Sequence, residues 1–252
     1  AKTTGQGEPA LFSHCSLAHS GAWDALRAQL ADHWTVTAID LPDHGRSNQT
    51  PDGTDPQRLA ADVLIDFAQD TGQKPHLIGH SFGATAALLA AVSAPDDWAS
   101  LTLIEPVMFG WAKGTAAWDE HAAALASFPS ALISGDRPLA TSLFMDVWGG
   151  GVPFRHLPKR QQAYIEQRIH IIAAQGPALN DDFNGVLPLV QSTPLMMPIT
   201  LIQGDQSPAI ARAILDVLHQ HLPQAHRHQI DGAGHMLPLT HAADVAKILR
   251  AL

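Results

Sequence analysis

The sequence predicts an α/β protein, a mostly parallel sheet with helices on both faces and a helical insertion in the second half of the chain. Short apolar segments alternate with segments of helical spacing in residues 10–106 and again in residues 199–252. A Gly-x-Ser-x-Gly pentapeptide at residues 79–83 stands between an apolar run and an Ala/Leu-rich stretch. Strand patterns are missing from residues 107–198. Together these features favour one sheet interrupted by a helical segment.

The first part of the chain supplies the first expected strands and helices. Strands are predicted at residues 10–13, 35–40, 76–79 and 101–105, each a short apolar run. Trp23, Leu26 and Leu30 follow helical spacing. A helix is expected from Asp55-Pro56 to about residue 71, because Asp is a good N-cap, Pro suits the first helical turn, and Gly72 is typical of a helix end.

The alternation resumes near the C-terminus. Strands are expected at residues 199–204 and 227–230, and helices at 209–222 and 240–252. The intervening residues 107–198 hold many of the chain's aromatic side chains, and residues 158–174 follow a helical pattern. We therefore expect a core domain formed by residues 1–106 and 199–252, with residues 107–198 as a helical insertion.

Composition limits the possible functions and partners. The net charge is −9 and no Lys/Arg cluster occurs, so nucleic acid is not an expected partner. The apolar stretches are too short to span a bilayer, and the single Cys15 suits a reducing, cytoplasmic location. The 15 histidines are not grouped with carboxylates at metal-ligand spacing. We expect a small-molecule substrate and no metal or cofactor, and no pattern indicates an oligomeric state.

Ser81 is the candidate nucleophile. A strand, a sharp turn and a helix are predicted around the pentapeptide, and its glycines allow the chain to fold back tightly. Such a turn lifts the serine hydroxyl away from the backbone, where a base can take its proton during attack. The alternative is a serine that only caps the following helix. The placement between two turn glycines favours the nucleophile.

Four motifs occur in the order typical of one superfamily. They are His14-Cys15-Ser16 after a strand, residues 40–47, the pentapeptide at 79–83, and Gly232-Ala233-Gly234-His235. On these motifs the chain resembles the α/β-hydrolase fold over nearly its whole length. Residues 14–18, 105–107, 148–150 and 234–241 also resemble those of a bacterial subgroup of capped hydrolases. The resemblance implies that residues 107–198 form a cap over the active site and that His235 is the general base.

The resemblance leaves the acid of the expected triad open. Family members usually carry it in a Gly-x-x-Asp pattern after the strand that follows the cap, but here that position is Ser207. Serine cannot supply the charge that stabilises an imidazolium. Glu105, at the end of the strand after the pentapeptide, is the favoured acid, because some members carry theirs there. Asp205 is the alternative, two residues from the usual place.

The oxyanion hole is expected to use backbone N–H groups of Phe82 and Ser16. Cys15 lacks an assigned base and is expected to be a packed residue rather than a second nucleophile. The expected pocket walls are Met108, Trp111, Phe144 and Trp148. The alternative for each of these four is that it only packs the insertion onto the core.

Together these features favour a serine hydrolase that forms an acyl-enzyme. Its expected substrate is a small, fairly apolar carboxylic ester, thioester or lactone. One alternative is hydrolysis of a C–C bond in a diketone, which uses the same type of turn. The other is a non-catalytic ligand-binding protein, which the missing Asp at position 207 favours.

Overall fold

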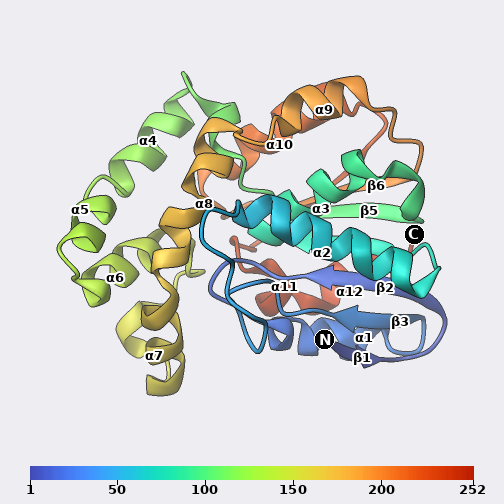
Figure 1. Ribbon diagram of the computed structural model, residues 1–252, viewed down its shortest axis with the longest axis horizontal. Coiled ribbons are helices and arrows are strands. Elements are labelled where there is room, and N and C mark those ends of the chain that lie inside the picture. Colours follow the sequence, from blue (N-terminus) through green and yellow to red (C-terminus); the bar gives the residue numbers. More distant parts are fainter.

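A seven-stranded sheet forms the centre of the computed structural model, which describes residues 1–252 (Figure 1). Its strand order is β1-β3-β2-β4-β5-β6-β7. The strands are β1 (Lys2–Thr4), β2 (Glu8–Ser13), β3 (Trp34–Ala38), β4 (His76–His80), β5 (Ser100–Ile104), β6 (Ile199–Gly204) and β7 (His226–Ile230). Only β1 pairs antiparallel, with β3, and every other pair is parallel. The predicted mostly parallel sheet is confirmed.

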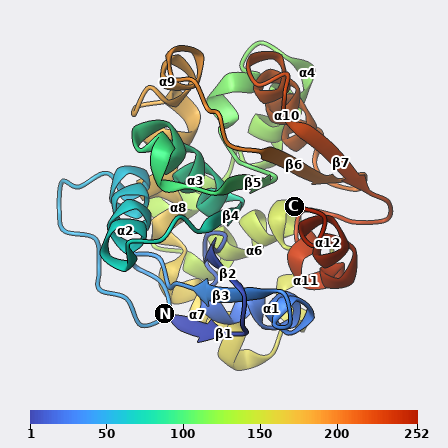
Figure 2. The same ribbon diagram turned by 90° about the vertical axis from the view of Figure 1, so that its right-hand side faces the viewer.

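Alternating side chains divide the sheet into two buried faces, because successive residues of a strand point to opposite sides. One face packs against α2 (Pro56–Thr71), α3 (Phe82–Ser93) and α10 (Ala209–His221), and its strand residues include Leu11, Leu77, Leu103 and Leu201. The other packs against α1 (Asp24–Leu30), α11 (Leu237–Thr240) and α12 (Ala242–Leu249), through Phe12, Ile78, Ile104 and Ile202. Figure 2 shows α2 and α3 on the opposite side of the sheet from α1 and α12.

Helix α2 begins and ends where the sequence predicts. The Asp55 side chain accepts from the backbone N–H of Arg58 at 2.8 Å, and Pro56 follows at the first helical position. Gly72 ends the helix with φ of 62°, a left-handed conformation that costs glycine little.

One predicted helix is divided in two, and another is shorter than predicted. Residues 158–174 lie in α7 (Lys159–Arg168) and α8 (His170–Asp181), with a break at the fully buried Ile169. The closing helix, predicted at residues 240–252, is α12 over Ala242–Leu249; the short α11 precedes it and ends before His241, where φ is −128°. Ile169 itself packs in an apolar cluster with Phe128 and Ile165.

Helices alone fill the chain between β5 and β6. They are α4 (Ala116–Ala124), α5 (Phe128–Ile133), α6 (Arg137–Trp148), α7, α8 and α9 (Val186–Ser192), with short 3₁₀ turns at Phe109–Ala112 and Phe154–His156. In the first part of the chain, 3₁₀ turns also occur at Ser20–Trp23 and Pro95–Asp97. Figure 1 shows α4 to α7 beyond the ends toward which the arrows of β2 and β3 point. We call residues 107–198 the inserted helical segment.

The inserted segment is only partly independent of the core. Helices α5, α6 and α7 share an apolar cluster that includes Phe128, Ala140 and Ile165. Val186 and Val190 of α9 instead belong to the same cluster as α2 and α3. The exact boundary between two domains therefore stays a prediction.

No helix is both long and apolar enough to cross a membrane. The parallel strands all end at one edge of the sheet, where side chains from distant parts of the sequence meet. The candidate site lies at this edge.

Candidate active site

The turn after β4 holds Ser81 in a strained conformation. Its φ of 56° and ψ of −120° lie in a region that non-glycine residues rarely adopt. A Cβ at Gly79 would lie 2.5 Å from Ala84 Cα, and a Cβ at Gly83 would lie 2.4 Å from Ser13 O, so both positions require glycine. Ser81 stands at the N-cap of α3 but makes no capping hydrogen bond with its side chain. Its hydroxyl is therefore free for another role, and Ser81 lines a large cavity.

His235 and Glu105 form a buried pair. His235 Nδ1 lies 2.7 Å from Glu105 Oε2, and the Glu105 side chain has no exposed surface. Because a carboxylate only accepts hydrogen bonds, the proton lies on Nδ1 and leaves Nε2 as an acceptor. The pair joins the end of β5 to the loop after β7, across β6. Glu105 has a φ of 45°, a second strained residue at this edge.

Asp205, unlike Glu105, makes no hydrogen bond with the imidazole of His235. It is exposed, and its Oδ1 accepts from Gly232 N at 2.7 Å, which ties two loops together. Of the two acids considered from the sequence, the structure brings Glu105 to His235.

His80 supports the loop that carries His235. Its Nε2 donates to the backbone oxygen of His235 at 2.8 Å. Burial, reinforced by the nearby His235, holds the pKa of His80 well below its usual value, so the ring is neutral. No sequence pattern indicates this bond, because the direction of a side chain at the end of a strand depends on the tertiary structure.

Ser81 and His235 line the same cavity, although no direct hydrogen bond joins them in this structure. Free enzymes commonly show such looser geometry before a substrate binds. Phe82 follows Ser81 at the start of α3. Ser16 also lines the cavity, and its backbone N–H has no hydrogen-bond partner in the protein. That N–H is thus available to a ligand oxygen.

Two buried histidines shape the loop after β2. His14 Nδ1 donates to Cys15 O at 2.8 Å, and its Nε2 accepts from Leu41 N at 3.0 Å. His44 Nε2 accepts from Leu17 N at 3.1 Å. Burial, with the neighbouring His44, lowers the pKa of His14 to about 3, so the neutral form that accepts from Leu41 persists at neutral pH. Burial raises the pKa of Cys15 to about 12, which keeps its sulfur protonated and a poor nucleophile.

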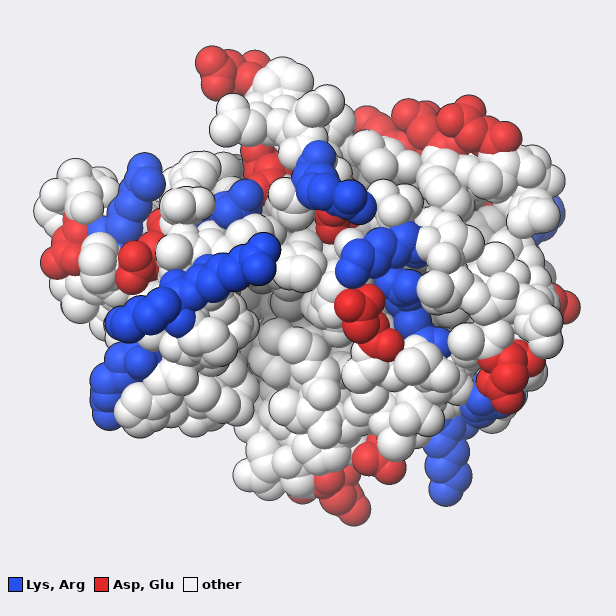
Figure 3. All heavy atoms as spheres, turned by 90° about the horizontal axis from the view of Figure 1, so that it is seen from below, with Lys and Arg blue, Asp and Glu red and all other residues white.

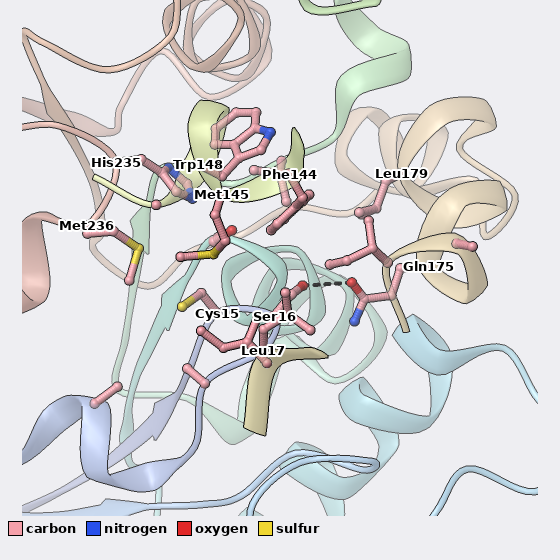
Figure 4. A pocket seen from close by; sticks show the side chains of 18 of the residues that line it. Cys15, Ser16, Leu17, Phe144, Met145, Trp148, Gln175, Leu179, His235 and Met236 are labelled. Atoms are coloured by element: carbon pink, nitrogen blue, oxygen red, sulfur yellow. Dashed lines mark hydrogen bonds between the residues drawn. The ribbon is translucent and has the colours of Figure 1, made fainter. Parts of the chain in front are cut away.

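Two side chains of the inserted segment form hydrogen bonds at this loop. Ser16 Oγ donates to Gln175 Oε1 of α8 at 2.6 Å, the bond drawn in Figure 4. The Tyr164 hydroxyl of α7 accepts from Gly45 N and donates to Ala18 O, both at 2.8 Å. The inserted segment therefore helps to fix the loop that carries Ser16.

The cavity has a volume of about 1410 Å³, above the roughly 300–1,000 Å³ typical of small-molecule sites. Phe144 and Trp148 line it, and the Trp148 ring lies 4.5 Å from the His235 ring (Figure 4). Further apolar walls that the sequence did not single out come from Leu125, Phe128, Leu132, Met145, Ile172 and Leu179. Most of the wall is therefore built by the inserted segment.

Two expected wall residues lie elsewhere, which corrects the prediction. Met108 is fully buried in the core, where its sulfur accepts from Gln57 Nε2 at 3.3 Å. Trp111 is turned to Asp182, to which its Nε1 donates at 3.2 Å. Both belong to the alternative weighed from the sequence, residues that pack the insertion onto the core.

Charged residues around the cavity are mostly basic. Lys2, Arg46 and Arg160 line it, with Asp40 as its one acidic residue. Burial acts to raise the pKa of Asp40, but hydrogen bonds from Ser20 and Arg46 outweigh it and lower the pKa to about 2. Figure 3 shows Lys and Arg side chains on both sides of a hollow in one face of the molecule. No group of three or more His, Cys, Asp or Glu is arranged to hold a metal ion.

The parallel sheet, together with the residues where its strands end, indicates the family to which the chain belongs. The model of the alpha/beta hydrolase family matches residues 10–248, and the chain belongs to this family. The resemblance inferred from the four motifs is thereby confirmed.

Individual relatives extend this result. The chain is 28% identical to the pimeloyl-[acyl-carrier protein] methyl ester esterase of Methylococcus capsulatus, over 98% of this chain and 95% of that protein. It is 38% identical to the dihydrolipoyllysine-residue acetyltransferase component of the acetoin cleaving system of Cupriavidus necator, over 44% of this chain but only 29% of that longer protein. An alpha/beta hydrolase from Sphaerobacter thermophilus superposes with a TM-score of 0.76 at 21% identity, covering 99% and 94% of the two chains. The family match and the esterase relative together support a hydrolase activity for this chain.

Proposed function

We propose that this protein is a serine hydrolase in which Ser81 is the nucleophile, His235 the base and Glu105 the acid. The observation that carries the proposal is the buried His235–Glu105 pair, at 2.7 Å, beside a cavity that Ser81 also lines. The pair leaves Nε2 of His235 as the nitrogen that can take a proton. A neutral imidazole held in this tautomer is what a weak serine nucleophile requires.

The proposed reaction has two halves. Ser81 Oγ attacks the acyl carbonyl while its proton passes to His235 Nε2, and the backbone N–H groups of Phe82 and Ser16 donate to the developing oxyanion. The imidazolium then gives this proton to the leaving alcohol or thiol as its bond to carbon breaks. Water next attacks the acyl-enzyme and gives a proton to His235 Nε2. His235 returns this proton to Ser81 Oγ as the ester bond breaks, which releases the carboxylic acid and free Ser81. Glu105 stays ionised throughout and stabilises the imidazolium.

The inserted segment is proposed to act as the cap that selects the acyl group. Phe144 and Trp148 supply aromatic surface next to His235. The mostly apolar cavity favours an apolar ester, thioester or lactone, and its volume also leaves room for acyl groups longer than the small ones expected from the sequence. The ester named for the Methylococcus relative supports ester hydrolysis as the reaction type.

Labelling with a fluorophosphonate probe tests the proposal. Ser81 Oγ should displace fluoride from phosphorus, giving one phosphonyl adduct per chain in the wild type and none in Ser81→Ala. Cys15→Ala is the matched control and should label fully, because its thiol is not the nucleophile. Equal labelling of Ser81→Ala, or none of the folded wild type, would refute the enzyme proposal, and the second result would favour a ligand-binding protein.

A panel of p-nitrophenyl esters of increasing acyl length would then define the substrate. We expect kcat/KM to rise with chain length until the cavity is filled, because each buried methylene contributes about 0.8 kcal/mol. A flat profile would contradict acyl recognition by this cavity.

A further inference from the structure

The loop after β6 contributes a hydroxyl group to the buried acid. Ser207 Oγ donates a short hydrogen bond to Glu105 Oε1, and Gly204 N donates to the same oxygen at 2.7 Å. The other oxygen, Oε2, faces His235 Nδ1. Two donors on one oxygen and one on the other determine the plane of the carboxylate.

Glu105 needs such support because of its position. It follows β5, and its side chain must extend past the end of the neighbouring strand β6 to reach the loop after β7. A glutamate has several rotatable bonds, and each must be restricted for Oε2 to face the imidazole. A carboxylate with no exposed surface also requires hydrogen-bond donors to remain charged.

We propose that Ser207 is a positioning residue for the relocated acid, and this rests on the proposed function of Glu105. Serine occupies the place where the family resemblance leads one to expect the acid itself. Its hydroxyl holds Oε1, so that Oε2 is directed at His235 from the adjacent strand. Ser207 does not line the cavity, so it acts on the reaction only through Glu105.

The loop does not depend on this hydroxyl for its own shape. Asp205 N donates to Ile230 O at 3.2 Å and Gln206 N to Ala233 O at 2.9 Å. Gly232 N donates in return to Asp205 Oδ1. These three bonds hold the loop against the one that carries His235 even when Ser207 is replaced. A loss of activity in a Ser207 variant would therefore reflect the orientation of Glu105.

The kinetic test compares variants with and without the hydroxyl. Ser207→Ala should lower kcat roughly tenfold, the effect of one hydrogen bond to a charged group, with KM nearly unchanged. Ser207→Thr should restore most of kcat, because it keeps the hydroxyl at a half-buried position. Ser207→Val has the same shape as threonine without the hydroxyl and should resemble Ser207→Ala. Asp205→Asn is the control for a substitution in the same loop that does not touch Glu105, and it should keep kcat.

A spectroscopic measurement separates positioning from turnover. The Nδ1 proton of His235 should give a downfield proton resonance that disappears in His235→Ala. The resonance should shift in Ser207→Ala and Ser207→Val, and stay in place in Ser207→Thr and Asp205→Asn. If Ser207→Ala does not fold, the Thr and Val variants still form a matched pair.

The outcomes distinguish this proposal from the proposed function. A wild-type kcat and resonance in Ser207→Val would overturn the role of Ser207, while labelling of Ser81 in the wild type would leave the hydrolase proposal intact. If the wild type is not labelled, the hydrolase proposal fails, and a shifted resonance in Ser207→Val would still support orientation of Glu105 by Ser207.

Discussion

Replacing Glu105 with glutamine should nearly abolish activity while keeping the shape of the side chain. Three donors converge on the carboxylate, from Gly204, Ser207 and His235. Glutamine has one acceptor oxygen in place of two, so one amide NH₂ group must face a donor. If it faces His235, the imidazole has to move its proton to Nε2 and loses its function as a base. If it faces Gly204, a buried N–H is left unpaired.

The magnitude follows from the charge as well as the geometry. Even with the amide oxygen toward His235, glutamine cannot stabilise the imidazolium that forms during attack. The equivalent Asp→Asn change in a serine protease triad lowers kcat by about 10⁴-fold. We expect a loss of about 10³- to 10⁴-fold in kcat for Glu105→Gln, or roughly 4–5.5 kcal/mol of transition-state stabilisation. The unpaired buried donor should also cost roughly 1–3 kcal/mol of stability.

The assay is steady-state hydrolysis of a p-nitrophenyl ester by the wild type, Glu105→Gln and Asp205→Asn. Asp205 is exposed and contacts Gly232 N, a bond that the asparagine oxygen can keep, so we expect less than about a threefold change in kcat for this control. Circular dichroism and urea unfolding would show that each variant is folded. Near-wild-type activity of Glu105→Gln, or an equal loss in both variants, would refute the assignment of the acid.

Three further predictions concern the fold around the site. Gly83→Ala should destabilise the protein by about 3 kcal/mol in urea unfolding, because its Cβ would lie 2.4 Å from Ser13 O. Gly176→Ala is the control and should be neutral or stabilising, because its Cβ would lie 3.6 Å from the nearest atom. Equal effects of the two substitutions would contradict the close approach at the turn. Burial lowers the pKa of His14 to about 3. Between about pH 6.5 and pH 3, His14 therefore binds a proton only in the unfolded chain, and the free energy of unfolding should fall by about 1.4 kcal/mol for each unit of decreasing pH. His14→Gln should be less stable at pH 7, but its free energy of unfolding should lose this part of the pH dependence. An unchanged pH dependence in the variant would show that His14 is protonated in the folded protein. Iodoacetamide should modify Cys15 in urea but not in the native protein near pH 8, since burial raises its pKa to about 12; rapid native alkylation would contradict this.

Local patterns were sufficient to predict much of the sheet. β6 has the bounds that its apolar run predicts, because a strand buried on both faces is nearly continuous in Val, Ile and Leu. The ends of α2 were also predicted, since Asp55 and Gly72 act through their own side chain or backbone. The division at Ile169 was not predicted, because it depends on how α7 and α8 pack in the folded protein.

The site shows the same division. The position of Ser81 follows from a local turn, and the pentapeptide predicts it directly. The proximity of Glu105 to His235 depends on strand order, which places β5 and β7 on either side of β6. The sequence could name Glu105 as a candidate but not exclude Asp205. Met108 and Trp111 were misplaced because residues beside a strand end can face either the core or a cavity, and nearby packing decides which.

The single phenol group of Tyr164 limits how far this protein can be treated as separable modules. Its hydroxyl accepts a hydrogen bond from Gly45 N and donates one to Ala18 O, and it belongs to helix α7 of the inserted segment. Deleting or exchanging that segment would remove this partner from both groups, beside the loop that carries Ser16. An attempt to change substrate range by grafting another cap should therefore retain α7 around Tyr164, or supply a new hydroxyl at the same point.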